Sequence, residues 1–177
     1  MLLGGLVWLG SGCKKDVDNP EEDGAHNALT TISLKFSQGG VLKYEAIFDD
    51  PDGPGGANPV RFDDIVLQKG QTYQVSITLT NKTKNPPEDM TAVIQAAGHQ
   101  HMFFFIPTDL PGLNITLTDS DRIGLPIGLE SVWVTPATPQ NGTLRVNLRH
   151  IAVGKTASSS PNSGHSDLLV DFATRIE

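Results

Sequence analysis

Apolar and polar side chains alternate with a period of two over much of the chain that follows residue 28. Residues 31–36 and 42–48 both alternate in this way, and Ser37-Gln38-Gly39-Gly40 lies between them. Successive side chains of a β-strand point to opposite faces, so this alternation indicates strands with one buried face. Two such runs joined by a glycine pair predict a β-hairpin.

Further stretches of the same type are separated by turns rich in glycine and proline. They span residues 64–68, 73–80, 101–106, 114–118, 131–135, 143–150 and 167–175. Short strands at regular spacing are typical of two packed sheets. The sequence therefore predicts an all-β fold, an immunoglobulin-like antiparallel β-sandwich with one short helix.

The helix is predicted to begin after Asn85, which suits a helix cap. Pro86 suits the first helical position, and Glu88 stands in capping-box register. The apolar residues that follow fall on one helical face and end before a glycine: Met90, Val93, Ile94 and Ala97, then Gly98. We interpret this stripe as the buried face of a helix that covers one end of the sandwich.

The N-terminal segment has the pattern of a secretory signal followed by a lipid anchor. Residues 2–9 are apolar but too few to span a bilayer, and Leu9-Gly10-Ser11-Gly12-Cys13 resembles a bacterial lipobox. The resemblance implies a signal peptide over residues 1–12 and membrane attachment through lipidated Cys13. The alternative is a buried N-terminal strand with a free core thiol.

A polar, acidic stretch follows Cys13. Residues 13–28 cannot bury enough apolar area to fold, so we interpret them as a flexible tether to a domain over residues 29–177. Lys14 replaces the aspartate that would favour inner-membrane retention, and an acidic run comes directly after it. These features favour the outer membrane, on its periplasmic face or at the cell surface.

Composition narrows the classes of function. The 177 residues include 13 basic and 20 acidic side chains, giving a formal net charge of −7. This acidity argues against nucleic acid as a partner, because nucleic-acid binders usually carry a basic stripe. The sequence contains no Gly-x-Ser-x-Gly, His-Glu-x-x-His or P-loop pattern, so we do not expect an enzyme.

Four histidines outside the tether form the first candidate site. His99 and His101 precede a strand, His150 ends one, and His165 precedes the last. If the strand that starts at His101 runs antiparallel to the strand that ends at His150, these side chains meet at one end of the sandwich. Clustered imidazoles suit zinc or copper, so the sequence predicts a metal site at His99, His101, His150 and His165. The alternative is a set of hydrogen-bonded surface histidines.

An acidic, glycine-rich loop forms the second candidate site. Asp50 and Asp52 alternate with Pro and Gly, and Asp64 follows nearby. Carboxylates in such loops can bind calcium, but the EF-hand pattern is incomplete because no glutamate follows at the required spacing. A solvated turn is the alternative that we favour.

Several segments resemble a family of small bacterial outer-membrane lipoproteins. The matching stretches include Thr31–Phe36, Asp50-Pro51-Asp52-Gly53, His101-Met102-Phe103-Phe104 and the closing Ser166–Phe172. The family is often labelled "type I periplasmic binding fold superfamily", although that fold needs two α/β lobes and this chain lacks the length and the pattern for them. Members are encoded near outer-membrane transporters, and they tend to carry acidic residues where this chain has Ala96-Ala97-Gly98 and His165.

Together these features predict a lipid-anchored outer-membrane lipoprotein that is not an enzyme. It would bind a metal ion or small ligand at the histidine-bearing rim, as an accessory to an outer-membrane transporter. The alternative is a structural or protein-interaction lipoprotein that binds no metal and contacts its partner through a strand edge or the 103–105 region. A weaker alternative is a hydrolase whose site assembles from loops.

Overall fold

The computed structural model describes residues 29–53 and 56–177. The signal peptide, Cys13 and the tether predicted for residues 1–28 lie outside this part of the chain. No helix among the described residues has both the length and the apolar character needed to cross a bilayer.

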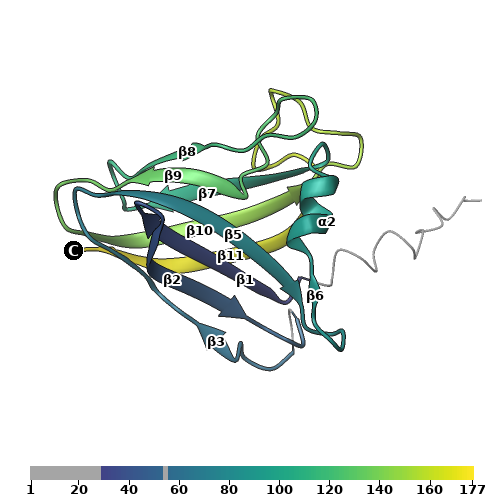
Figure 1. Cartoon of the computed structure of the whole chain (residues 1–177), viewed down its shortest axis with the longest axis horizontal. Coiled ribbons are helices and arrows are strands. Elements are labelled where there is room, and N and C mark those ends of the chain that lie inside the picture. Colours follow the sequence, from purple (N-terminus) through teal and green to yellow (C-terminus); the bar gives the residue numbers. More distant parts are fainter. Residues whose placement is uncertain (1–28, 54–55) are drawn as a thin grey trace, which may run out of the picture.

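Two sheets pack face to face in the described part of the chain (Figure 1). The larger sheet has the order β3-β2-β1-β5-β9-β8, with β6 beside β5. Its strands are β1 (Thr31–Gln38), β2 (Val41–Asp49), β3 (Arg61–Phe62), β5 (Thr72–Asn81), β6 (Glu88–Asp89), β8 (Asn114–Leu117) and β9 (Glu130–Val134). The predicted hairpin is confirmed as β1 and β2.

The smaller sheet has the order β4-β11-β10-β7. Its strands are β4 (Ile65–Leu67), β7 (His101–Thr108), β10 (Gln140–His150) and β11 (His165–Ile176). The long central pair is antiparallel, as is β10 with β7, whereas β4 runs parallel to β11. Within residues 29–53 and 56–177 an all-β sandwich with one short helix is therefore confirmed, and the pair of β4 with β11 at one edge is its one parallel pair.

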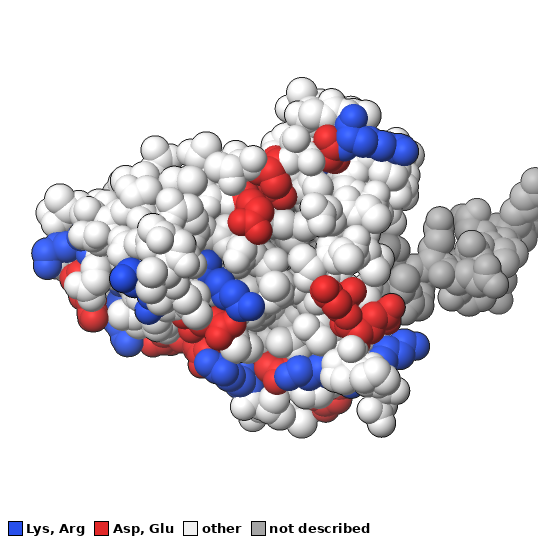
Figure 2. Space-filling view, in the orientation of Figure 1, with Lys and Arg blue, Asp and Glu red and all other residues white. Residues whose placement is uncertain are grey.

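The core lies between the sheets and is filled by large side chains from both, whereas Lys, Arg, Asp and Glu side chains are interspersed on the face that Figure 2 shows. Trp133 and Phe36 of the larger sheet are fully buried and contact each other edge to face, with ring centroids 5.1 Å apart. Phe172 and Leu148 of the smaller sheet are also fully buried. Burying side chains of this size supplies the main favourable free energy of folding.

The helix begins later than its sequence pattern predicts. It is α2 (Thr91–Ala96), while Glu88 and Asp89 form β6 against Asn81 and Thr80 of β5. The predicted start after Asn85 is wrong because the backbone of residues 88–89 pairs with β5 instead. The carboxylate of Asp89 then accepts the backbone N–H of Thr91 at 2.8 Å.

The described chain enters the sandwich at the end that α2 covers. Thr30 donates its backbone N–H to Thr80, which pairs with Asp89 just before α2. Ile94 is the residue that α2 buries. The start of β1, the helix and the start of β7 therefore lie at one end of the molecule (Figure 1).

Candidate functional site

Strand register brings three of the predicted histidines together. His150 lies opposite His101 of β7 on one side and opposite His165 of β11 on the other. The antiparallel pairing expected from the sequence is confirmed. Directly opposed residues on a sheet face have neighbouring side chains, so these imidazoles meet at the end of the smaller sheet.

A β-bulge adds a carboxylate to the three histidines. Leu148 pairs with Leu168 and Arg149 with Ser166, so Asp167 is an extra residue on β11. Strict alternation from buried Leu168 would turn Asp167 outward. The bulge instead lets two successive side chains face inward, and the side chain of Asp167 is only 1% exposed.

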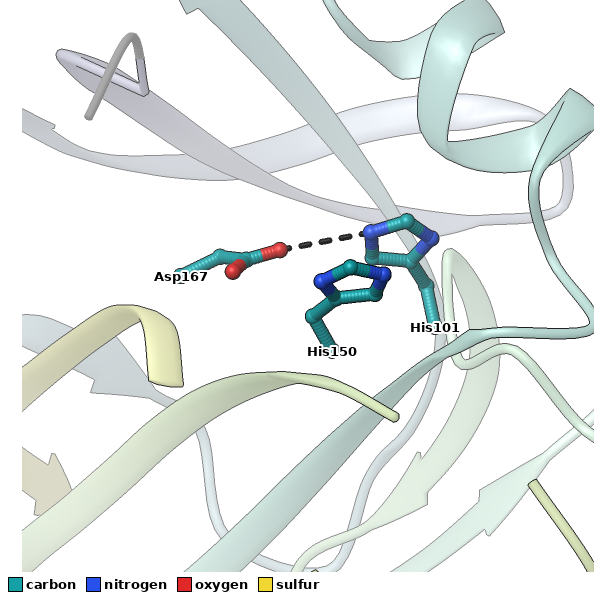
Figure 3. A group of neighbouring side chains, drawn as sticks. All are labelled: His101, His150 and Asp167. Carbon is teal, nitrogen blue, oxygen red and sulfur yellow. Dashed lines mark ion pairs between the residues drawn. The ribbon is translucent and has the colours of Figure 1, made fainter. Parts of the chain in front are cut away.

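The four side chains form a connected cluster. Asp167 Oδ2 lies 3.3 Å from Nε2 of His101, and its Oδ1 lies 3.3 Å from Nε2 of His165. That same nitrogen of His165 is 3.2 Å from Nδ1 of His150. Figure 3 shows the rings of His101 and His150 stacked beside the Asp167 carboxylate, with their centroids 4.8 Å apart and their planes 11° apart.

The hydrogen bonding of His101 fixes where its proton lies. Nδ1 of His101 is 3.0 Å from the backbone carbonyl oxygen of Ala97, just after α2. A carbonyl oxygen can only accept, so Nδ1 carries a proton, and in the neutral ring Nε2 presents its lone pair. That lone pair faces the carboxylate of Asp167, which also offers only lone pairs when it is ionised. A ring proton on Nε2 would make this contact an ion pair, and a metal ion could take the place of that proton.

The donor atoms lie close enough for a shared ion after a small movement. One donor atom from each of His101, His150 and Asp167 lies within 4.8 Å of the other two. An ion bound at about 2.0–2.1 Å holds any two donors within about 4.2 Å of each other. Around a tetrahedral ion the donors lie about 3.4 Å apart, so binding would shorten the widest donor separation by about 1.4 Å.

Two of the predicted metal ligands lie outside this group of three. His99 is in the turn before β7, where its backbone carbonyl accepts the N–H of Lys155. His165 contacts two of the three residues, but its own side chain is 54% exposed. The structure thus brings His101, His150 and His165 together and does not add His99 to the group.

Asp167 is a candidate site residue that the sequence did not predict. The spacing His165-x-Asp167 is the available signal, because it places both side chains on one face of a strand. However, the buried run of Leu168, Val170 and Phe172 is out of phase with them. The bulge allows Asp167 and Leu168 to face inward together, and no residue type in the sequence predicts a bulge at this position.

A buried lysine holds the backbone of the site. Lys155 donates from Nζ to the carbonyl oxygens of His101, at 2.9 Å, and of Pro126. It also pairs with Asp121 at 3.3 Å, and neither side chain is more than 1% exposed. Burial lowers the pKa of Lys155 below its ordinary 10.5, and the carboxylate of Asp121 opposes this change. The ammonium group therefore ties the 119–127 loop to the first residue of β7.

The side chains of the predicted calcium site at Asp50, Asp52 and Asp64 do not converge on one point. Asp52 accepts the backbone N–H of Ala57, and Asp64 pairs with Arg175 at 3.1 Å. The pKa of Asp50 is raised, first by burial and then by hydrogen bonding with Asp52. Among the described residues, the three predicted calcium ligands Asp50, Asp52 and Asp64 do not form a group of converging donor atoms.

Comparisons with known proteins identify no relative. No protein-family model matches the chain, and neither curated proteins nor solved structures show significant similarity to it. The resemblance to small outer-membrane lipoproteins stays a prediction, and the functional argument rests on the geometry of the site.

Proposed function

We propose that this protein is a lipid-anchored, non-enzymatic lipoprotein of the outer membrane that binds one divalent transition-metal ion. The ligands are His101, His150 and Asp167, with His165 beside them. Attachment through Cys13 and an accessory role for an outer-membrane transporter come from the sequence pattern and belong to the same proposal.

One observation carries the metal proposal. The carbonyl of Ala97 fixes the proton of His101 on Nδ1, so the Nε2 lone pair and the Asp167 carboxylate face each other at 3.3 Å in a buried site. This is the arrangement of metal-ligating histidines, which commonly donate their other ring N–H to a backbone carbonyl. Both groups could bind an ion placed between them.

The donor set favours zinc or copper over calcium or magnesium. Imidazole nitrogens bind borderline metals well, whereas calcium and magnesium prefer sites made of oxygen atoms. The sole cysteine of the chain is Cys13, which the proposal assigns to lipidation. No cysteine thiolate is then available to the site, and thiolates are the ligands that select Cu(I). The donor set therefore fits Zn²⁺ or Cu²⁺ better than Cu(I).

Calorimetric titration of the full chain in detergent, with Zn²⁺ and separately with Cu²⁺, tests the proposal. Wild type should bind one ion per chain with saturation. Asp167→Asn and His101→Ala should each weaken binding at least about tenfold. His99→Ala is the matched control, because His99 is a nearby histidine outside the group, and it should bind like wild type. The absence of saturable binding by wild type would refute the proposal.

A protein-interaction role is the second candidate, and it has an observation of its own. Among the described strands β7 pairs only with β10, so it forms an edge of its sheet. A hollow of about 170 Å³ opens beside it, lined by residues of β7 and β8: Met102, Phe103, Phe104, Phe105, Ile115 and Leu117. Such an edge can add a strand from a partner. Loss of partner capture in Phe104→Lys, with metal binding absent from wild type, would favour this role instead.

A further inference from the structure

We infer that His165 is the exchange ligand of the metal site. It is the side chain that completes the coordination of the ion from the solvent side and leaves first when the ion is passed on. This inference rests on the proposed metal-binding function and specifies how that site is loaded and emptied.

Exposure divides the cluster into an inner and an outer part. The side chains of His101 and Asp167 are 7% and 1% exposed, whereas that of His165 is 54% exposed. His150 is buried as well. Of the four side chains, His165 is thus the one that an incoming chelator or partner can reach directly.

The contacts of His165 place it at the outer side of the same coordination space. Its Nε2 atom lies 3.2 Å from His150 Nδ1 and 3.3 Å from Asp167 Oδ1. His101 contacts the other carboxylate oxygen, Oδ2. The carboxylate therefore has His101 on one oxygen and His165 on the other. The converging donor group consists of the inner three residues, so the His165 side chain would have to move for its nitrogen to reach an ion that they hold.

The backbone that carries His165 is held in place, so exchange needs only side-chain motion. Gly164 has φ of +62°, and a Cβ atom there would lie 1.9 Å from the carbonyl oxygen of His150. This close packing and the left-handed conformation both require glycine. Arg149 adds hydrogen bonds to the carbonyls of Ser163, at 2.8 Å, and Gly164. The turn is thus fixed against the end of β10, and the exposed imidazole is its mobile part.

The exchange step is a ligand substitution without redox change. An incoming nitrogen or oxygen donor forms a bond to the ion as the bond between the ion and His165 Nε2 breaks. The released ring would return to its contact with Asp167 Oδ1, which is 3.3 Å from Nε2 in this structure. The ion keeps its charge throughout, and the three inner ligands hold it until the incoming donor has bound.

The test measures how fast the ion leaves. The full chain in detergent is loaded with one equivalent of Zn²⁺, and transfer to the chromogenic chelator 4-(2-pyridylazo)resorcinol is followed by stopped flow. His165→Ala should still bind one ion per chain but release it on the order of tenfold faster or more. His165→Gln should behave in the same way, because glutamine can retain the hydrogen bond to Asp167 but is a poor ligand for zinc.

A spectroscopic readout separates coordination from a structural role. The Co²⁺-loaded protein should change its visible d–d absorption in His165→Ala, because the ion loses one nitrogen ligand, whereas His99→Ala should match wild type in spectrum and rate. Release rates within twofold of wild type together with an unchanged spectrum in both His165 variants would overturn the inference. Failure of wild type to bind Zn²⁺ or Co²⁺ at all would instead overturn the proposed function, so the two failures are distinguishable.

Discussion

Replacing Lys155 with methionine should destabilise the fold more strongly than any exposed lysine substitution. The Nζ atom of Lys155 contacts three oxygen atoms, from His101, Pro126 and Asp121, and its side chain is 0% exposed. Methionine fills a similar volume but offers no donor. The variant therefore leaves a buried carboxylate without its cation and two buried carbonyls without this donor.

The expected magnitude follows from the burial of the pair. Removing one partner of a buried ion pair costs about 3–5 kcal/mol, because the remaining charge stays out of water without compensation. A domain of this size has a free energy of unfolding of about 5–15 kcal/mol, so the loss is a large fraction of the total. Adding Asp121→Asn should recover about 1–2 kcal/mol, since asparagine removes the uncompensated charge while its side-chain oxygen can still accept from the backbone.

Urea denaturation followed by far-ultraviolet circular dichroism measures these free energies. Lys69→Met is the control, because Lys69 is exposed and its loss should change stability by less than about 0.5 kcal/mol. A loss of less than about 1 kcal/mol in Lys155→Met would contradict the reasoning, as would a double variant less stable than Lys155→Met alone.

Three further predictions concern the core, acid stability and the membrane. Phe103→Ala should lower the free energy of unfolding by about 3–5 kcal/mol in urea, because Phe103 is 1% exposed and truncation leaves a cavity; a loss below about 1 kcal/mol would show that the site collapses freely. Burial alone would raise the pKa of Asp121, but the N–H groups of Leu125 and Ile123 and the ammonium of Lys155 hold that pKa below its ordinary 3.8. Ionised Asp121 therefore stabilises the fold fully above about pH 4, and this contribution is lost as the pH falls through the lowered pKa of Asp121 in the folded state. In Asp121→Asn the free energy of unfolding should consequently fall less steeply with decreasing pH below about pH 4. An equally steep acid limb in that variant would contradict this assignment. Cys13→Ser should move the protein from the membrane to the soluble fraction after cell lysis, and continued tight membrane association would rule out the lipid anchor.

Most of the fold could be predicted because alternation with a period of two is a strong local signal. It locates the long strands, including the antiparallel pair that brings His101 opposite His150. The two-residue strands β3 and β6 were missed, because two residues carry no period. The helix start was misplaced because pairing of Glu88 and Asp89 with β5 competes with a favourable cap at Asn85, and only the tertiary structure decides between them.

The candidate site could be predicted in part for the same reason. Register is a property of whole strands, so the meeting of His101, His150 and His165 follows from where the strands begin and end. Asp167 depends on a bulge, and Lys155 on a loop that folds back more than 50 residues after His101. Neither feature has a periodic sequence signal, because each arises from how separate segments pack.

The entry of the chain beside α2 has a consequence for where metal transfer would take place. If Cys13 carries lipid, the 15 residues between it and Leu29 limit the distance from the bilayer to the helix-covered end to about 55 Å, even when fully extended. The histidine cluster lies at that same end, because His101 contacts the backbone carbonyl of Ala97 just after α2. A transporter in the same membrane would then meet the loaded site at a high effective concentration set by the tether length, so transfer could be efficient even when the contact between the two proteins is weak.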